Sequence, residues 1–558
     1  MPTVIAKRED WSYQRGAGIV ELHRPKSVNP WVVTMSVMLA TFMEILDTTV
    51  VNVSIQHIAG SMAATVEEGT WVVTSYLVSN AIILPMSGWL ANRFGRRRLI
   101  LACVAGFTVT SVLCAVSTSL EWLIVFRVLQ GLTGGGMQPL AQAIMLESFP
   151  KEKHGHAMAA YGLGIILAPI LGPMLGGYIT DNYSWRWIFY LNAPVGVLSL
   201  VLMLKFVWDP PYIRPQKGGV DLWGMGFLAV GLGSLQVVLD TGQRKDWFAS
   251  DFIRFYAALC IFGLILLVIR ELWTEHPVVD LRALKDTTFS AGVFLISIIG
   301  FILYASLVLL PIYLQTLLGY PAYTAGLALS PRGLGSLCTM PIVGVLTSKT
   351  DPRRILGFGF TVCALTMLDL SHLNTNAGYW DIFWPQVFQG VGLSCLFIPL
   401  MAVSMSRIPK ERMGNATSIF NLTRNIGGSF GIAVMTTFLT RRNQFHYVRL
   451  GESLTAGNLG TQQAFEGLKA WFRTHGDDPY TAGQRALGAL HGMLQRQAAM
   501  LSFVEAFWVM AIMFFCMVPF LFLLRRPDHQ VKGKADTSLA RGRKPHEKSA
   551  EEPVFEMH

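Results

Sequence analysis

The chain carries fourteen long apolar runs, each bounded by charged or turn-forming residues, and these runs constrain its fold more than any other feature. A membrane-spanning helix needs about 20 apolar residues, and each run is close to or above that length. Only 14% of the 558 residues are charged, far below the ~25% typical of soluble globular proteins. An all-α integral membrane protein is therefore predicted, with helices near 31–54, 70–91, 99–117, 121–147, 155–180, 187–207, 221–240, 252–272, 289–315, 324–347, 354–373, 380–405, 413–440 and 500–524.

The charges between the runs are distributed unevenly. Starting from a cytoplasmic N-terminus, the inside loops carry clusters of Lys and Arg such as the one at 96–98, whereas the outside loops hold little beyond Arg186, Arg244 and Lys245. By the positive-inside rule this asymmetry predicts a multi-pass protein of the cell (inner) membrane with both termini in the cytoplasm. It also explains the net charge of +10 without nucleic acid as a partner. The first 30 residues lack the pattern of a removable signal peptide.

Residue patterns for enzyme chemistry are missing from the sequence. All seven cysteines lie in apolar runs, without a CxxC pair or a His at metal-ligand spacing, so neither a disulfide framework nor a metal centre is predicted. The sequence has no Walker-type GxxxxGK[ST], no Gly-rich nucleotide loop after a strand pattern and no nucleophile elbow. We therefore expect no enzyme, no catalytic residue and no cofactor.

Two segments of the chain recur at a nearly constant offset. Residues 84–90, followed by two arginines, recur as 340–346, and the segment 128–131 recurs as 387–390. The repeat predicts two six-helix halves that share one orientation, with a site between them. The helices near 221–240 and 252–272 have no counterpart and are interpreted as an inserted hairpin.

The predicted organisation follows from these patterns. The long external loop 441–499 contains stretches around 462–473 and 482–500 with helical spacing of apolar residues. The tail has too few apolar residues to fold alone. The predicted segments are a cytoplasmic N-terminal segment 1–30, an N-terminal six-helix bundle 31–207, a linker with two extra transmembrane helices 208–288, a C-terminal six-helix bundle 289–524 that includes the external loop, and a disordered basic cytoplasmic tail 525–558.

Several motifs along the chain resemble those of a known family. The segment GWLANRFGRR at 88–97 resembles the loop signature of the major facilitator superfamily. Four further segments are similar to the fourteen-helix drug:H⁺ antiporters of the EmrB/QacA type, closest to EmrB-like multidrug export permeases: LDTTVVNV at 46–53, RVLQG at 127–131, the Gly-rich run 164–177 and WRWIF at 185–189. The resemblance covers about residues 30–525 and implies a major facilitator fold, with two six-helix bundles and two extra central helices.

Two groups of residues in these motifs bear on conformation. The arginine-rich loop is either a positive-inside anchor or a contact made in only one conformation; the resemblance favours the second, although the family usually has Asp where this chain has Asn92. Glycines and a proline in the fifth predicted helix permit close helix approach and a bend, and the resemblance there implies export rather than uptake. The candidate conformational residues are Gly88, Asn92, Arg93, Gly95, Arg96, Arg97, Gly164, Gly172, Pro173, Gly176 and Gly177.

Asp47 is the main candidate for proton coupling. An Asp at the centre of a spanning helix costs roughly 2.5–3.5 kcal/mol on insertion scales, and a protonatable carboxyl is a role that would justify this cost. The alternative is a structural Asp that is hydrogen-bonded to neighbouring helices. Glu44, three residues earlier, either shares the proton or lines the cavity.

Arg127 is the second candidate because a buried guanidinium must face water, a carboxylate or carbonyl groups. The resemblance implies a role in proton transfer, with Gln130 as a polar neighbour; a structural pin between helices is the alternative. Arg332, Arg424 and Asp369 also fall inside apolar runs, and without motif support we interpret them as cavity-lining or structural residues.

Aromatic and Met side chains in the central helices suit variable apolar ligands. Core or lipid-facing positions are the alternative for each of them, and no compound is assigned. The candidates for the substrate cavity, with the polar Gln130, are Phe42, Met43, Trp71, Tyr76, Gln130, Tyr304, Trp384 and Phe388.

These observations predict a proton-coupled secondary transporter that exports hydrophobic or amphipathic small molecules by alternating access. It needs no cofactor because the proton gradient drives it. One alternative is an exporter or carrier of a narrow solute such as an organic acid or a siderophore, and a second is a membrane-embedded sensor or scaffold. The external loop 441–499 is a candidate docking site for a periplasmic adaptor protein that leads to an outer-membrane channel.

Overall fold

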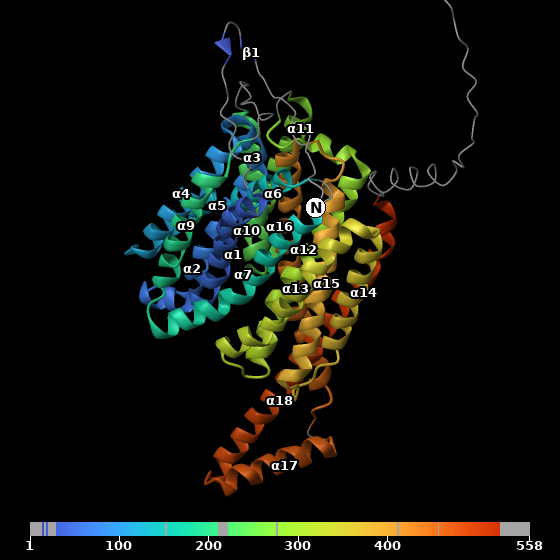
Figure 1. The fold of residues 1–558 in the computed structure, drawn as a ribbon. Helices are drawn as coiled ribbons and strands as arrows, with labels where there is room; N and C mark the ends of the chain where they lie inside the picture. Colours follow the sequence, from blue (N-terminus) through green and yellow to red (C-terminus); the bar gives the residue numbers. More distant parts are fainter. Residues whose placement is uncertain are drawn as a thin grey trace, which may run out of the picture.

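The computed structural model describes residues 14–15, 18–19, 29–150, 153–209, 221–274, 277–409, 412–455 and 457–524. The predicted tail 525–558 and most of the predicted segment 1–30 lie outside the described residues. Two short antiparallel strands, β1 (Gln14–Arg15) and β2 (Gly18–Ile19), pair Gln14 with Ile19. The rest of the regular structure described is helical (Figure 1).

The helices of the N-terminal half follow the predicted runs closely. Two predicted runs were wrong in being taken as single helices: 187–207 is divided at Leu191, and 121–147 is divided at Gly135 and Gly136. A Cβ on Gly135 would lie 2.6 Å from the Asn80 carbonyl oxygen, so the chain approaches α3 closely there. The elements are α1 (Pro30–Ser61), α2 (Val66–Gly69), α3 (Trp71–Phe94), α4 (Arg96–Ala115), α5 (Leu120–Gly134), α6 (Met137–Ser148), α7 (His154–Asn182), α8 (Trp187–Tyr190) and α9 (Asn192–Phe206).

The inserted hairpin and the C-terminal half complete the fold. Of the 3₁₀ turns with every residue described, η2 (Gln243–Lys245), η3 (Trp247–Ala249) and η4 (Leu281–Lys285) lie in the connections, and η6 (Pro519–Leu523) lies near the end of the described chain. The helices are α10 (Leu222–Thr241), α11 (Asp251–Trp273), α12 (Thr287–Thr316), α13 (Ala322–Lys349), α14 (Pro352–Leu370), α15 (Tyr379–Met405), α16 (Met413–Gly451), α17 (Leu459–Thr474) and α18 (Pro479–Met517).

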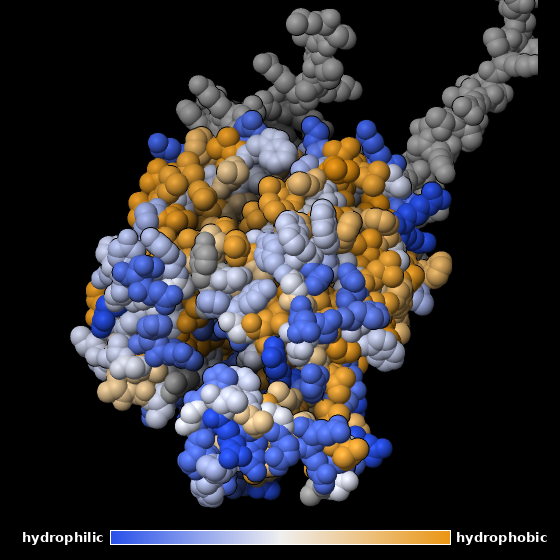
Figure 2. Space-filling model, turned by 90° about the horizontal axis from the view of Figure 1, so that it is seen from below, coloured by the Kyte–Doolittle hydropathy of each residue, from blue (hydrophilic) through white to orange (hydrophobic). Residues whose placement is uncertain are grey.

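The helices match a membrane-spanning protein. If α5 with α6 and α8 with α9 each count as one segment, and α2 and α17 are left out, fourteen segments correspond to the fourteen predicted runs. Within the described ranges, ten helical stretches are long and apolar enough to cross a membrane by length and composition. Seen from the end at which α17 projects, polar side chains gather on the nearer segments and hydrophobic ones cover much of the flanks (Figure 2).

The predicted external segment 441–499 is largely helical, and α17 and α18 cover the stretches 462–473 and 482–500 for which helical spacing was noted. Helix α16 continues to Gly451, and α18 begins at Pro479, well before the predicted span at 500–524. The Asp478 carboxylate caps α18 by accepting hydrogen bonds from the backbone N–H groups of Tyr480 and Thr481. Hydrogen bonds from the Thr481 hydroxyl and backbone lower the pKa of Asp478. Helix α17 and the start of α18 project from the bundle (Figure 1).

The two halves meet at the end of the bundle where α1 begins, which we call the α1 end. A Cβ on Gly155 of α7 would lie 2.5 Å from the carbonyl oxygen of Gly344 in α13. A Cβ on Gly88 of α3 would lie 3.0 Å from the carbonyl carbon of Gly414 in α16. Gly88 and Gly344, and likewise Gly155 and Gly414, are equivalent positions of the predicted repeat. The α1 end is therefore closed by two contacts that the pseudo-twofold axis relates: α7 of the N-terminal half against α13, and α3 against α16.

The inserted helix α10 contacts both halves. A Cβ on Gly233 would lie 3.3 Å from Ile82 of α3, and Gln236 accepts a hydrogen bond from Ser429 of α16 at 3.0 Å. Just beyond α10, the Trp247 indole donates to the Thr437 hydroxyl of α16, also at 3.0 Å. The hairpin therefore packs against α3 and α16 together.

Candidate functional site

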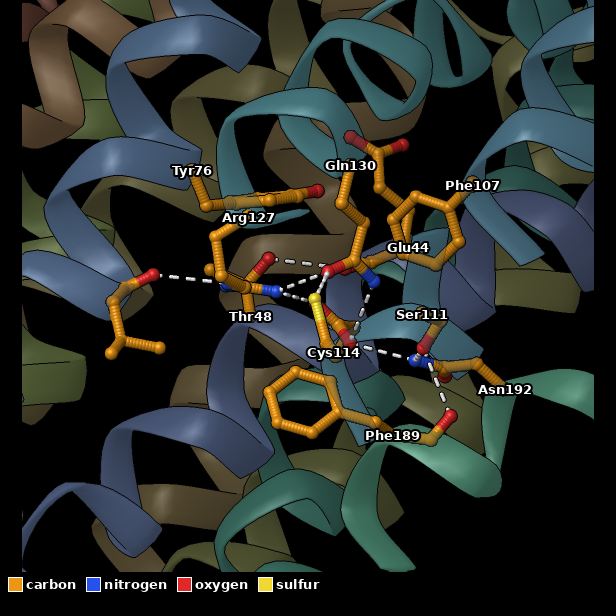
Figure 3. Close-up of polar contacts among 12 residues, drawn as sticks. Glu44, Thr48, Tyr76, Phe107, Ser111, Cys114, Arg127, Gln130, Phe189 and Asn192 are labelled. Atoms are coloured by element: carbon orange, nitrogen blue, oxygen red, sulfur yellow. Dashed lines mark hydrogen bonds and ion pairs between the residues drawn. The ribbon is translucent and has the colours of Figure 1, made fainter. Parts of the chain in front are cut away.

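A buried ion pair lies in the core of the N-terminal bundle. Arg127 Nη1 of α5 lies 2.6 Å from Asp47 Oδ2 of α1, and the side chains of both residues are 0% exposed (Figure 3). Taking two charges out of water costs several kcal/mol per ion unless hydrogen bonds satisfy the remaining atoms. Arg127 thus faces a carboxylate, one of the three kinds of partner expected for a buried guanidinium.

Hydrogen-bond donors surround the Asp47 carboxylate. Its Oδ1 accepts from Asn192 Nδ2 of α9 at 2.6 Å and from Gln130 Nε2 at 3.3 Å. The Ser111 hydroxyl donates its hydrogen to the Phe189 carbonyl, so it can only accept a hydrogen bond from Asn192. This fixes the orientation of the Asn192 amide, with its nitrogen toward Ser111 and Asp47. Every side chain that hydrogen-bonds Asp47 therefore donates, and this arrangement fits the ionised carboxylate.

Arg127 has further partners besides Asp47, although its Nη2 is buried without a hydrogen-bond partner among the described residues. Its Nε donates to the Val72 carbonyl of α3 at 3.0 Å, and its Nη1 also donates to Gln130 Oε1 at 2.8 Å. The guanidinium lies 4.2 Å from the ring centroid of Tyr76, a cation–π contact that adds to the ion pair. These contacts connect the ion pair to α3. A change in the charge of Asp47 therefore affects contacts of α1, α3 and α5.

Glu44 lies apart from this network, one turn earlier on α1 (Figure 3). Its Oε1 accepts from Asn80 Nδ2 of α3 at 3.0 Å and from Gln138 Nε2 of α6 at 3.2 Å. Its Oε2 is buried without a hydrogen-bond partner among the described residues. Glu44 therefore has one oxygen without a hydrogen-bond partner that can carry a proton, whereas each oxygen of Asp47 accepts at least one hydrogen bond.

The C-terminal bundle holds a related cluster that lacks the acid. Arg332 of α13 donates from Nε to Gln386 Oε1 of α15 at 2.9 Å and approaches the Ser306 hydroxyl of α12 at 3.5 Å. In the N-terminal bundle Gly131 faces the Tyr76 carbonyl, and at the equivalent repeat position Gly390 faces the Arg332 carbonyl. Arg332 therefore occupies the place of Tyr76, and no carboxylate pairs with it among the described residues.

The remaining cavity candidates occupy varied places. Gln130, Tyr76 and Met43 are buried, with Gln130 and Tyr76 in contact with Arg127. Phe42, Trp71 and Tyr304 are partly buried.

Two candidates lie on the outside. Trp384 and Phe388 are 54% and 52% exposed, and their ring centroids are 6.3 Å apart on the outer face of α15. These two residues do not join the buried cluster. Asp369, which falls inside an apolar run, is exposed near the end of α14.

The arginine-rich loop contacts its own bundle and also lies against the other one, since Arg96 Nε is 3.9 Å from the place of a Cβ on Gly414 of α16. Gly95 has φ +89°, a left-handed conformation that glycine adopts readily, between α3 and α4. Buried Arg96 forms an ion pair with Glu147 of α6. The backbone N–H of Arg97 donates to Asp209 Oδ1 at 2.8 Å, and the Arg97 guanidinium lies 4.1 Å from the ring centroid of Trp208. Arg93 and the partly buried Asn92 lie in the last turn of α3.

The glycines of α7 pack on α1, the helix that holds Asp47. Cβ atoms on Gly164 and Gly172 would collide with Met38 and Thr49, and one on Gly176 would lie 3.0 Å from the Val50 carbonyl oxygen. The neighbouring Pro173 lies against Gly326 of α13, whereas Gly177 faces open space. Small residues therefore bring α7 close to α1, as small-residue interfaces do in membranes.

Sequence reasoning missed several residues of the site. Asn192, Ser111, Asn80 and Gln138 all donate within the two acidic clusters or orient a donor there. The only signal that pointed to them was that each is a polar residue inside an apolar run. Their roles depend on which helices pack together, which single-sequence patterns do not specify.

Two related helical bundles with a buried acid–arginine pair define a polytopic membrane transporter rather than an enzyme. The chain belongs to the Major Facilitator Superfamily, whose family model matches residues 37–432. The predicted fold class and family are thereby confirmed.

Curated relatives and solved structures agree with this assignment. Multidrug export protein EmrB of Escherichia coli (strain K12) is 36% identical over 89% of this chain and 95% of its own length. EmrB of Haemophilus influenzae is 40% identical over 78% and 85%, and Fatty acid resistance protein FarB of Neisseria gonorrhoeae is 34% identical over 90% and 97%. The proton:xylose symporter XylE, 16% identical over 86% of this chain and 99% of its own, has a TM-score of 0.53, a likeness that shows the fold alone.

Proposed function

We propose that this chain is a proton-coupled exporter of hydrophobic or amphipathic small molecules that works by alternating access. The relatives named multidrug export protein support the direction and the substrate class. The observation that carries the coupling is the Asp47–Arg127 ion pair, enclosed by donors inside membrane-spanning helices. A buried ionisable residue in a spanning helix is costly and marks a functional pathway.

The geometry supports a route from the acid to the closure of the bundles. Protonation of Asp47 removes the charge that holds Arg127 and frees α1 to move relative to α5. Helix α1 packs on the glycine face of α7, and α7 contacts α13 at Gly155 and Gly344. A change at Asp47 therefore reaches the contact that closes the α1 end through packed neighbours.

We assign the α1 end to the cytoplasm of a cell whose inner membrane holds the protein, with both termini on that side. The arginine clusters at 96–98 and 353–354 support this assignment by the positive-inside rule. In this orientation the structure is closed toward the cytoplasm. Protons then enter from outside and substrate leaves toward it, in opposite directions through one cavity.

Substrate contacts are proposed for the aromatic and Met side chains that border the buried acids. Met43 and Tyr76 are buried beside Glu44 and Arg127, and Phe42, Trp71 and Tyr304 are only partly buried. Polarisable, flexible surfaces of this kind accommodate ligands of varied shape.

The test is ΔpH-driven efflux from proteoliposomes loaded with a panel of hydrophobic dyes. The wild type is expected to export dye when an inward proton gradient is imposed and to stop when the gradient is collapsed. Asp47→Asn should abolish gradient-driven export while still binding dye. If Asp47→Asn exports with undiminished gradient dependence, Asp47 is not the coupling residue.

We further propose that the projecting segment made of α17 and the start of α18 docks a periplasmic adaptor that leads to an outer-membrane channel. Helix α17 has no buried residue, and Leu459 and Trp471 on it are 67% and 54% exposed. Leu487 and Met493 of α18 are similarly exposed. Exposed apolar side chains on a polar projection are typical of protein-interaction sites.

A further inference from the structure

A polar seam joins the two bundles next to Glu44. Gln138 of α6 donates to Glu44 Oε1 at 3.2 Å, and its amide oxygen accepts from Arg424 Nη2 of α16 at 2.5 Å. Glu44 and Arg424 are each only 2% exposed. One glutamine therefore connects a carboxyl group of the N-terminal bundle to a guanidinium of the C-terminal bundle.

The seam continues from this point to the α1 end. Asn421 donates to Gln142 Oε1 at 2.5 Å, and the Thr417 hydroxyl donates to the Pro139 carbonyl at 3.1 Å. Further along, the Ser87 and Ser418 hydroxyls lie 2.8 Å apart. Opening of the α1 end must break these contacts together, so the Gln138–Arg424 bond belongs to the surface that closes the cytoplasmic side.

The Glu44 carboxylate and the Arg424 guanidinium are connected through the Gln138 amide. In the described parts of the chain neither Glu44 nor Arg424 forms an ion pair, and Glu44 Oε2 and Arg424 Nε have no hydrogen-bond partner. The other titratable groups that face Glu44 are Asp47 of its own helix, Tyr76 of α3, Cys103 of α4 and Tyr161 of α7. Arg424 is therefore the cation that faces Glu44, at the far end of a bridging amide.

We propose that Glu44 carries a proton during transport and that Gln138 and Arg424 are the positioning residues through which the C-terminal bundle senses it. With Glu44 ionised, the Gln138 amide is oriented with its nitrogen toward the anion and its oxygen toward the cation, and it holds the bundles together. Protonation of Glu44 removes the negative end of this bridge, in an environment where charge interactions are strong. The seam then weakens and the cytoplasmic end opens.

The direction agrees with antiport. A proton that arrives from outside weakens the cytoplasmic closure, and its release into the cytoplasm restores the bridge once the substrate has been taken up. This inference rests on the proposed function, but it assigns Gln138 and Arg424 roles that the Asp47–Arg127 pair does not require.

The inference is tested by measuring the opening of the cytoplasmic end directly. Spin labels on Lys153→Cys and Lys349→Cys, both exposed beside the Gly155–Gly344 contact, report the distance between α7 and α13. The exposed Cys338 and Cys516 are replaced by Ser in this background. Distances are recorded by pulsed electron paramagnetic resonance in nanodiscs at pH 5 and pH 8 without substrate.

The wild type is expected to shift toward the long distance at pH 5. Glu44→Gln and Arg424→Gln should each show the long distance at both pH values, with the open-to-closed ratio at pH 8 raised about tenfold, within the usual range of coupling. The double variant should add nothing further, and Arg424→Lys, which keeps the charge, should keep a pH-dependent shift.

Asn421→Ala is the matched control because it breaks a neutral hydrogen bond across the same seam. It should favour opening yet keep the wild-type response to pH. If Arg424→Gln also keeps the full response to pH, the inference is overturned. The proposed function fails separately, if wild-type proteoliposomes show no ΔpH-driven efflux whatever the labels report.

Discussion

Gly155 of α7 and Gly344 of α13 meet backbone to backbone, with a Cβ on Gly155 placed 2.5 Å from the Gly344 carbonyl oxygen. The repeat-related contact of Gly88 with Gly414 and Asn415 closes the other side of the seam in the same way. Two pairs of glycine positions thus determine how near the bundles come at the cytoplasmic end.

Gly155→Val should prevent this closure. Overpacking of a tight contact costs about 1–3 kcal/mol, which corresponds to roughly a 5- to 150-fold loss of the closed population. Gly177→Ala in the same helix is the control, since no atom lies within 4 Å of its Cβ position. A cysteine that replaces buried Ser418 of the seam, with the exposed Cys338 and Cys516 changed to Ser, is labelled by a membrane-impermeant maleimide in inverted vesicles to measure the change. Equal labelling of wild type and Gly155→Val would show that the contact does not control access.

Asp47→Asn should destabilise the protein as well as uncouple it. Loss of one partner leaves the Arg127 charge buried without its anion, which costs about 3–5 kcal/mol. Asp47→Asn combined with Arg127→Gln should recover much of the thermal stability in detergent but no gradient-driven efflux. A double variant that is no more stable than Asp47→Asn would contradict the pairing.

Asn192→Leu should alter the pH profile of transport. The change removes the donor at 2.6 Å from Asp47 Oδ1, and a hydrogen bond to a charged group contributes about 1.5–3 kcal/mol. Loss of this donor favours the protonated carboxyl, so the profile of efflux against pH should move to higher pH. Ser199→Ala is the control, because Ser199 bonds the same two helices through the Ser36 carbonyl and touches no acid. An unchanged profile for Asn192→Leu would exclude a role for Asn192 in proton coupling.

Replacement of residues 455–478 by a short Gly/Ser linker should separate transport from docking. Whole-cell efflux is expected to be lost, because the adaptor has no site, whereas efflux from proteoliposomes is retained. Loss in both assays would indicate that α17 serves folding and would reject the adaptor proposal.

The fold could largely be predicted because its main signals are local. Apolar length and charge placement gave helices such as α10 and α11 to within one or two residues of their ends. The break between α5 and α6 was not predicted, since a glycine can continue a helix or interrupt it depending on what lies beside it, here α3. The predicted domain boundaries remain predictions.

The site was predictable only where a single residue carries a large cost. A charge in an apolar run identifies Asp47 and Arg127 without any knowledge of their neighbours. Asn192 and Gln138 are neutral, so their position in the sequence gave no comparable signal, and their partners come from helices distant in sequence. For the same reason Trp384 looked like a ligand contact, although it lies on an exposed face.

The α10–α11 hairpin has a consequence for the motion of the whole protein. Because α10 packs against α3 on one side and is hydrogen-bonded to α16 on the other, the two bundles do not move against each other alone. Each rocking motion must also move the α10–α11 hairpin or slide along it. The amplitude of the conformational change is therefore limited by the shape of an element that belongs to neither half.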